Sequence, residues 1–417
     1  MPQLLESTSE RLVYKAYASA VIDPTTEPSP ASDPATSGGQ ILRHVSHNLS
    51  LTKEAYAADE IRTDKQRPME KHGTRRVPGT INGLLSAGTH QDLFEAVLGG
   101  TWSVSAITAS QTDFTSVTAD ASTAKFTFSA GNPVTKGFRV GDIIQFADLS
   151  DADNNGVNFM IIGFGGTSNR EVSVYPAPET MTADSAFTLT TIGRSLITPS
   201  SAHVARKYAV EVHNSDGDIS RLFTEGLFSG FDLSLAPNQN AQINFSGMWR
   251  NRVVYSAGDA PFFASPTAET TSDIISSMDA LLRINGAVVG VATGLSINYN
   301  REPSAPAQLN RDGLAAGILL ANAIVTGQFT VFLTATTFLD AFNDGTEMEL
   351  IAYLPASNAA AAAALTLYLP RLKINSNQEV VVDGAKALQC GFTAARYLGS
   401  GAGIESTSIR ITDTSVS

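Results

Sequence analysis

Histidine is the side chain most often used for metal binding and proton transfer near neutral pH, so the six histidines come first. They are scattered through the 417 residues, at His44, His47, His72, His90, His203 and His213. His44 and His47 are three positions apart, and on a strand they would point to opposite faces, which makes a poor metal pair. The sequence also lacks a His-Glu-x-x-His motif, a nucleophile elbow and a phosphate-binding glycine loop. We therefore expect no enzymatic activity and no metal or other cofactor.

An Asp-rich segment is the one candidate for a calcium loop. Asp151-Ala-Asp-Asn-Asn-Gly156 fits the first half of an EF-hand loop. The bidentate glutamate of such a loop should stand at position 162, where this chain has Ile162, and the flanks have the pattern of strands rather than helices. We therefore expect a turn rich in Asp and Asn between two strands.

Composition narrows the classes of function further. Lys and Arg number 28 against 40 Asp and Glu, a net charge of −12, so a basic nucleic-acid-binding face is not expected. The single cysteine, Cys390, excludes an intrachain disulfide and should be a small core residue. No apolar run has the length of a bilayer span, and Met1–Lys15 lacks the apolar core of a signal peptide. We expect no membrane insertion.

The scaffold that must position these side chains contains one pattern twice. Residues 80–102 predict a strand, a short helix and the start of another strand, with Thr89 as the helix N-cap and Gly99-Gly100 as the helix end. The same order recurs as a strand over 328–333, a helix over 336–343 and a strand over 348–354.

The flanking segments correspond as well. Arg43–Lys53, expected as the first strand, resembles Val291–Asn300, and 230–235 resembles 370–374. We predict an internal duplication, and the alternative is two unrelated halves of one β-rich domain.

Strand-like segments dominate the rest of the chain, so the fold class is mainly β, a sandwich or barrel with short flanking helices. We expect an N-terminal arm over 1–40, a first part of the main domain over 41–110, an inserted small β-domain over 111–195, and the remainder with the second half-repeat over 196–417. Two long loops, 54–78 and 301–313, interrupt the strands. The first is rich in charges of both signs, which suits a polar contact with another subunit or ring, and a solvated mobile loop is the alternative. The candidate contact residues are Asp59, Glu60, Arg62, Asp64, Lys65 and Arg67.

Several segments, taken in order, carry a family resemblance. They are Glu60–Gln66, Gly83–Trp102, Glu225–Asn244, Gly294–Asn300 and Val325–Phe332. Together they resemble the tail tube proteins of long-tailed, non-contractile bacteriophages (siphoviruses). Residues 137–162 are similar to an extra module found in some members of that family.

The resemblance implies a structural virion protein that self-assembles into rings, which stack into the tail tube and form a conduit for DNA ejection. It implies sixfold symmetry or pseudosymmetry, reached with six chains or with three duplicated chains. The implied partners are further copies of the chain, the tape measure protein, the tail terminator and the distal tail proteins, with DNA passing through the lumen without specific binding. Assembly would take place in the bacterial host cytoplasm. Alternatives are another virion component (baseplate, terminator or capsid decoration) and, less favoured, a β-rich hydrolase.

Overall fold

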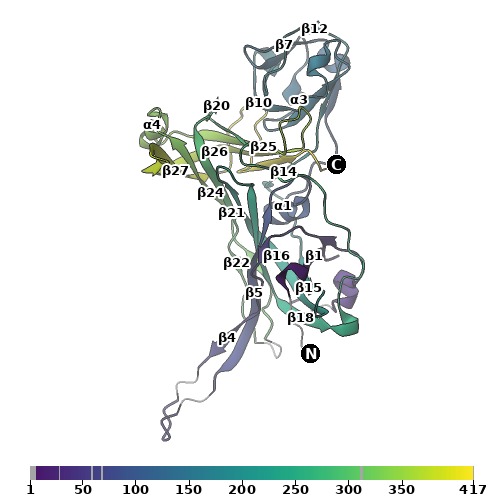
Figure 1. Ribbon diagram of the computed structural model, residues 1–417, viewed down its shortest axis with the longest axis vertical. Helices are drawn as coiled ribbons and strands as arrows, with labels where there is room; N and C mark the ends of the chain where they lie inside the picture. Colours follow the sequence, from purple (N-terminus) through teal and green to yellow (C-terminus); the bar gives the residue numbers. More distant parts are fainter. Residues whose placement is uncertain (1–5, 28, 58–59, 67–68, 310–312, 417) are drawn as a thin grey trace.

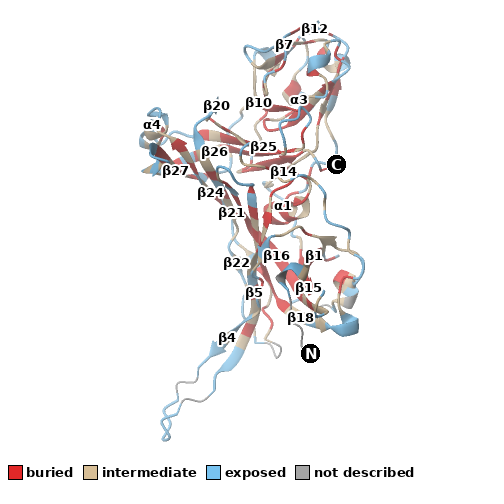
Figure 2. Ribbon diagram, viewed as in Figure 1, coloured by how far each residue is buried: buried red, intermediate tan, exposed pale blue. Residues whose placement is uncertain are grey.

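A computed structural model describes residues 6–27, 29–57, 60–66, 69–309 and 313–416. The chain is mainly β, which confirms the expected fold class. One large sheet forms the body, an eight-stranded sheet lies at one end of the elongated molecule, and a long hairpin projects from the other end (Figure 1). Figure 2 shows the buried residues running along the body strands, while the tip of the hairpin is exposed.

The first half of the body forms an antiparallel ladder in the order β1, β15, β16, β17, β5 and then β3 with β4. Strands β2 and β18 border this ladder, pairing with β1 and β16, whereas β14 pairs with β28 of the second half. The bounds are β1 Glu10–Ala16, β2 Gln40–Ile41, β3 Ser46–His47, β4 Thr52–Tyr56, β5 Lys71–Leu84, β14 Arg194–Ile197, β15 Tyr208–Asn214, β16 Ile219–Leu235, β17 Gln242–Trp249 and β18 Asn251–Ser256.

The second half forms a ladder in the order β19, β25, β26, β27, β24 and β21. Strand β20 borders β19, and β28 pairs with both β26 and β14. The bounds are β19 Leu281–Ile284, β20 Ala287–Val288, β21 Ala292–Asn300, β24 Ile324–Phe332, β25 Met348–Pro355, β26 Ala364–Val382, β27 Ala385–Ala394 and β28 Arg410–Asp413.

The two ladders have the same order of strands, and their irregularities coincide. The register of β16 against β17 shifts between Phe228 and Gly230, and that of β26 against β27 shifts between Ile374 and Ser376. When the two ladders are aligned on these register shifts, Gly79 of β5 corresponds to Gly327 of β24. At both glycines an added Cβ would lie within 3 Å of a neighbouring atom. The structure therefore confirms the predicted internal duplication.

Each half carries one short helix, α1 (Gln91–Leu98) and α4 (Thr337–Asp344). Both end on a glycine in the left-handed conformation, as expected, at Gly99 (φ 67°) and Gly345 (φ 62°). The expected N-cap was wrong by one residue. His90 takes that position without a side-chain cap, because the hydroxyl of Thr89 is bonded to side chains of Ser86 and Thr270 instead.

The eight-stranded sheet has its own core, in which phenylalanine is the most frequent residue. It packs on β25 and β26 through the faces of those strands that point away from the main core: Leu350 and Ala352 point to the main core, while Ile351 and Tyr353 contact the inserted sheet. Its elements are β6 Thr108–Ser110, α2 Gln111–Phe114, β7 Val117–Asp120, β8 Lys125–Phe128, α3 Pro133–Lys136, β9 Ile143–Ala147, β10 Phe159–Gly165, β11 Glu171–Tyr175, β12 Met181–Asp184 and β13 Thr188–Thr191. The division of the chain into domains, with an insertion over 111–195, stays a prediction.

Three local expectations need correction. Residues 10–16, expected in an extended arm, form β1, where Leu12 and Val13 are fully buried. The single strand expected over 43–53 is broken into β3 and β4, because the side chain of Asn48 takes up the amide of Thr80 in place of a main-chain partner. The segment 54–78, expected as a loop, is a loop only in its middle: residues 54–56 lie in β4 and residues 71–78 in β5, the two arms of a hairpin.

Short elements complete the chain. They are the helical turns η1 Ser7–Ser9, η2 Ala31–Ala35, η3 Ala152–Asn154, η4 Thr167–Asn169 and η5 Ala257–Asp259, and the paired strands β22 Pro303–Ser304 and β23 Leu319–Leu320. Among the described residues no helix combines the length and the apolar character that a bilayer crossing requires.

Candidate functional site

The two halves of the chain join edge to edge through β16 and β21. Six residues pair in antiparallel register, from Gly230 with Asn300 to Leu235 with Leu295. On the core side of this joint, the ring of Phe231 stacks on that of Tyr299 at 5.8 Å between centroids, and Leu233 and Ile297 are buried beside them. On the other side Asn298 donates a hydrogen bond to Asp232. The joint makes one continuous sheet from two repeats.

Two strand edges equivalent to this joint have no such neighbour in the part of the chain that the structure describes. Residues 376–381 of β26 pair with β27 alone, although their counterparts in β16, residues 230–235, lie next to β21 as well. Strands β3 and β4 pair with β5 alone, although their counterpart β21 is held between β24 and β16. Unpaired edges of this kind template further strand pairing.

The hairpin of β4 and β5 carries the charged residues expected to contact another subunit or ring. The structure brings three of them together at the tip, where Arg62 lies 3.7 Å from Glu60 and 3.3 Å from Asp64. The hydrogen bond from Arg62 holds the pKa of Asp64 below its usual value, with help from the Gln66 amide. Lys65 is exposed beside them, whereas Asp59 and Arg67 lie outside the described residues. The arrangement is a solvated polar tip far from the body (Figure 1).

The second expected loop lies against the base of that hairpin. The amide of Arg75 in β5 donates to the carbonyl of Gly313 at 2.8 Å, and Leu314 forms a bridge to the same residue. Gly313 has φ 65°, and a Cβ there would come within 3.0 Å of the Gly73 carbonyl oxygen. The second half of the chain therefore supports the projecting hairpin of the first half.

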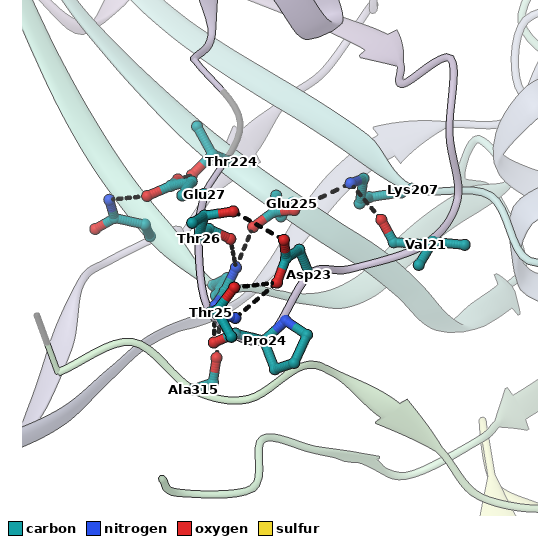
Figure 3. Close-up of polar contacts among 12 residues, drawn as sticks. Val21, Asp23, Pro24, Thr25, Thr26, Glu27, Lys207, Thr224, Glu225 and Ala315 are labelled. Carbon is teal, nitrogen blue, oxygen red and sulfur yellow. Dashed lines mark hydrogen bonds and ion pairs between the residues drawn. The ribbon is translucent and has the colours of Figure 1, made fainter. Parts of the chain in front are cut away.

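A buried charge cluster that the sequence did not predict is centred on Glu225 of β16, on the same strand as the joint (Figure 3). Glu225, fully buried in β16, accepts from Lys207 at 3.0 Å and from Arg250 at 2.7 Å. The same two cations bond main-chain carbonyls of the N-terminal segment, Lys207 to Val21 and Arg250 to Thr26 and Pro24. Charged groups are almost never fully buried unless they are paired in this way.

The charge cluster also reaches the second half, because Arg250 donates to the carbonyl of Ala315 at 2.7 Å. The Lys207 ammonium lies 4.4 Å from the centre of the Tyr17 ring, and burial raises the pKa of the Tyr17 hydroxyl. No spacing in the sequence marked these residues, since Glu225 lies within β16 while Lys207 and Arg250 lie just outside strand ends, and most of their partners are main-chain atoms. The cluster fixes the N-terminal segment to both halves of the chain.

The candidate calcium loop is a turn, as expected. Asp151 accepts from the amide of Asp153 at 3.2 Å, and the side chain of Asn154 is buried against the main chain of Glu179. Within the described residues no group of three or more His, Cys, Asp or Glu side chains is placed to hold a metal ion.

Comparison with known proteins bears on the whole chain. A family model described as phage tail tube protein matches residues 12–394. No curated protein matches the chain. The matched region runs from β1 to the last residue of β27, and so includes both ladders, the joint, the hairpin and the inserted sheet.

Proposed function

Because the chain belongs to the phage tail tube protein family, a family of virion tail components, we propose that it builds the tube of a non-contractile tail. Copies of the chain associate head to tail into rings, and the rings stack into a hollow conduit for DNA ejection. The tape measure protein, the tail terminator and the distal tail proteins are the expected partners inside the tube and at its ends. Assembly takes place in the host cytoplasm.

The observation that carries this proposal is the β16–β21 joint. It shows how one repeat of this chain binds the next, through a continuous antiparallel ladder over six residues. The same chain leaves the two corresponding edges without a partner in the described residues. A head-to-tail contact between different surfaces generates a ring when its rotation closes. Three chains with two repeats each give the sixfold pseudosymmetry that the family resemblance implies.

The net charge supports the role of a conduit. Each chain carries −12, and several chains surround one lumen. A wall with the sign of DNA phosphate attracts no DNA and gives it few places to bind. DNA therefore passes through the lumen without specific binding.

We infer that the inserted sheet lies on the outside of the tube. It packs on the faces of β25 and β26 that point away from the main core, through Val140, Ile143 and Met160. A unit of this size does not fit between the strands of a closed ring. On the outside it decorates the virion or is dispensable for assembly.

Negative-stain electron microscopy of the purified chain over a rising concentration series tests the proposal. We expect rings and stacked tubes of uniform width, because edge pairing and stacking are properties of the chain itself. A chain that stays monomeric at all concentrations, with no ring or tube in the images, would contradict the proposal.

A further inference from the structure

The joint within the chain is a template for the contact between chains. The register shifts described above align β16 with β26, so that Gly230 corresponds to Ser376 and Leu235 to Val381. Pairing with β5 and β24 aligns the edge strands, so that Asn300 corresponds to Thr52 and Leu295 to His47.

From this correspondence we infer the surface and the register by which one chain binds the next. Residues 376–381 of β26 pair antiparallel with residues 47–52 of a second copy, Ser376 opposite Thr52 and Val381 opposite His47. The β26 edge therefore pairs with the β3–β4 edge of another copy of this chain. This inference rests on the proposed ring and specifies its interface.

One further main-chain hydrogen bond extends the ladder of β16 and β21 beyond its six residue pairs. Within the chain the amide of Arg301 donates to the carbonyl of Ser229 at 2.9 Å, just beyond the β16–β21 pairs. Asn375 and Lys53 stand at the corresponding positions, and both are exposed. The bond that extends the ladder can therefore form between two exposed residues.

Before two chains associate, the two edges are in contact with water, and their side chains differ from those of the joint within the chain. The joint within the chain buries Phe231 and Leu233 against Tyr299 and Ile297. The corresponding positions at the free edges are Asn377 and Glu379 on β26, and Leu51 and Leu49 on the other edge. On the β26 edge, polar and charged side chains limit indiscriminate strand pairing, while the main-chain ladder remains available to the matching partner. On the other edge, Leu49 is buried in the main core and Leu51 packs against that core.

One pair of positions tests the register directly. Asp232 and Asn298 touch across the joint, so their counterparts Gln378 and Ser50 should touch across the interface between chains. Both side chains are exposed, which leaves the fold unaffected by substitution, and the native Cys390 is buried. Directly opposed residues have Cβ atoms about 4.5–5.5 Å apart, within reach of a disulfide, whereas diagonal pairs lie about 7–8 Å apart.

The experiment compares the double variant Ser50→Cys/Gln378→Cys with the shifted control Ser50→Cys/Val380→Cys and with each single variant. After mild oxidation of the assembled protein, denaturing electrophoresis should show linked oligomers for the first variant, ending at the number of chains in one ring. The shifted pair should give at least about fivefold less linked product, because its Cβ atoms are diagonal.

Electron microscopy of the same samples distinguishes a wrong register between chains from a failure of the chain to assemble. Tubes that form without linkage at Ser50 and Gln378, or with equal linkage in the shifted control, overturn the register and leave the proposed function standing. Assembly absent from every sample, single variants and wild type included, overturns both.

Discussion

At the scale of residues, buried charged groups attach the N-terminal segment to the rest of the chain. Glu225 has a left-handed backbone (φ 51°) and no exposed surface, and two cations bridge it to the main chain of residues 21–26. Removing one partner from such a cluster leaves an uncompensated buried charge. The charges are therefore structural, and they attach the N-terminal segment to the strand that carries the joint between the halves.

We expect the burial of His90 to make the stability of the fold depend on pH. Its imidazole is buried, stacks on Phe245 at 5.5 Å, and has an Nδ1 atom without a hydrogen-bond partner within the described residues. Burial lowers the pKa of His90 to about 3, with a smaller contribution from Arg43. Between that pKa and the usual value near 6.5, the unfolded chain binds more protons than the folded chain. The free energy of unfolding therefore falls as the pH falls through this window.

The variant His90→Leu should remove this dependence. Between pH 6.5 and 4.5 the wild type should lose up to about 1.4 kcal/mol per pH unit more than the variant, measured by chemical denaturation of unassembled protein. His72→Gln, which changes an exposed histidine of the hairpin, is the matched control and should follow the wild type. Parallel stability curves for wild type and His90→Leu would refute this assignment.

Residue patterns in the sequence predicted part of this picture. The apolar face of α1 and its terminal Gly99 could be read directly, because both follow from local spacing. The charge cluster could not be read, since Lys207, Glu225 and Arg250 are far apart and their partners are mostly carbonyl groups that every residue carries.

At the scale of elements, the β4–β5 hairpin is the feature that projects from the body and is placed to reach another copy of the chain. Its arms pair from Thr52 with Arg76 to Tyr56 with Lys71, and its charged tip extends away from the body. We propose that the tip contacts the adjacent ring. The sequence predicted this segment as a contact and as a loop throughout; it missed the strand ends at 54–56 and 71–78, because their largely polar residues do not alternate with buried apolar ones.

Replacing residues 57–70 with Asn-Gly tests the role of the hairpin tip. This two-residue turn would connect Tyr56 to Lys71, which already face each other, so the fold and the rings should remain. Tubes should be lost, because the contact between rings is removed. The readouts are thermal unfolding for the fold and electron microscopy for rings and tubes.

A matched control makes the same replacement in the inserted sheet. There Asn-Gly would replace residues 121–124 and connect Asp120 to Lys125, a facing pair of β7 and β8. This variant should form tubes like the wild type. Tubes of normal length from the shortened β4–β5 hairpin would rule out its proposed role.

At the scale of the whole molecule, the duplication is the central feature. The sequence predicted it from two similar helices, and the structure extends it to six strands in each half with matching register shifts. The joint between the halves could not be predicted from sequence, because strand pairing over about 70 residues leaves no local pattern. In the proposed ring, one chain supplies two consecutive units.

The number of chains in one ring is the measurement that tests this account most directly. A reconstruction of the assembled tube by electron cryomicroscopy, processed without imposed symmetry, should show three chains per ring. In it, the β26 edge of each chain should be paired to the β3–β4 edge of the next, as β16 is paired to β21 within the chain. Rings of six chains, or rings in which these two edges do not meet, would contradict the account.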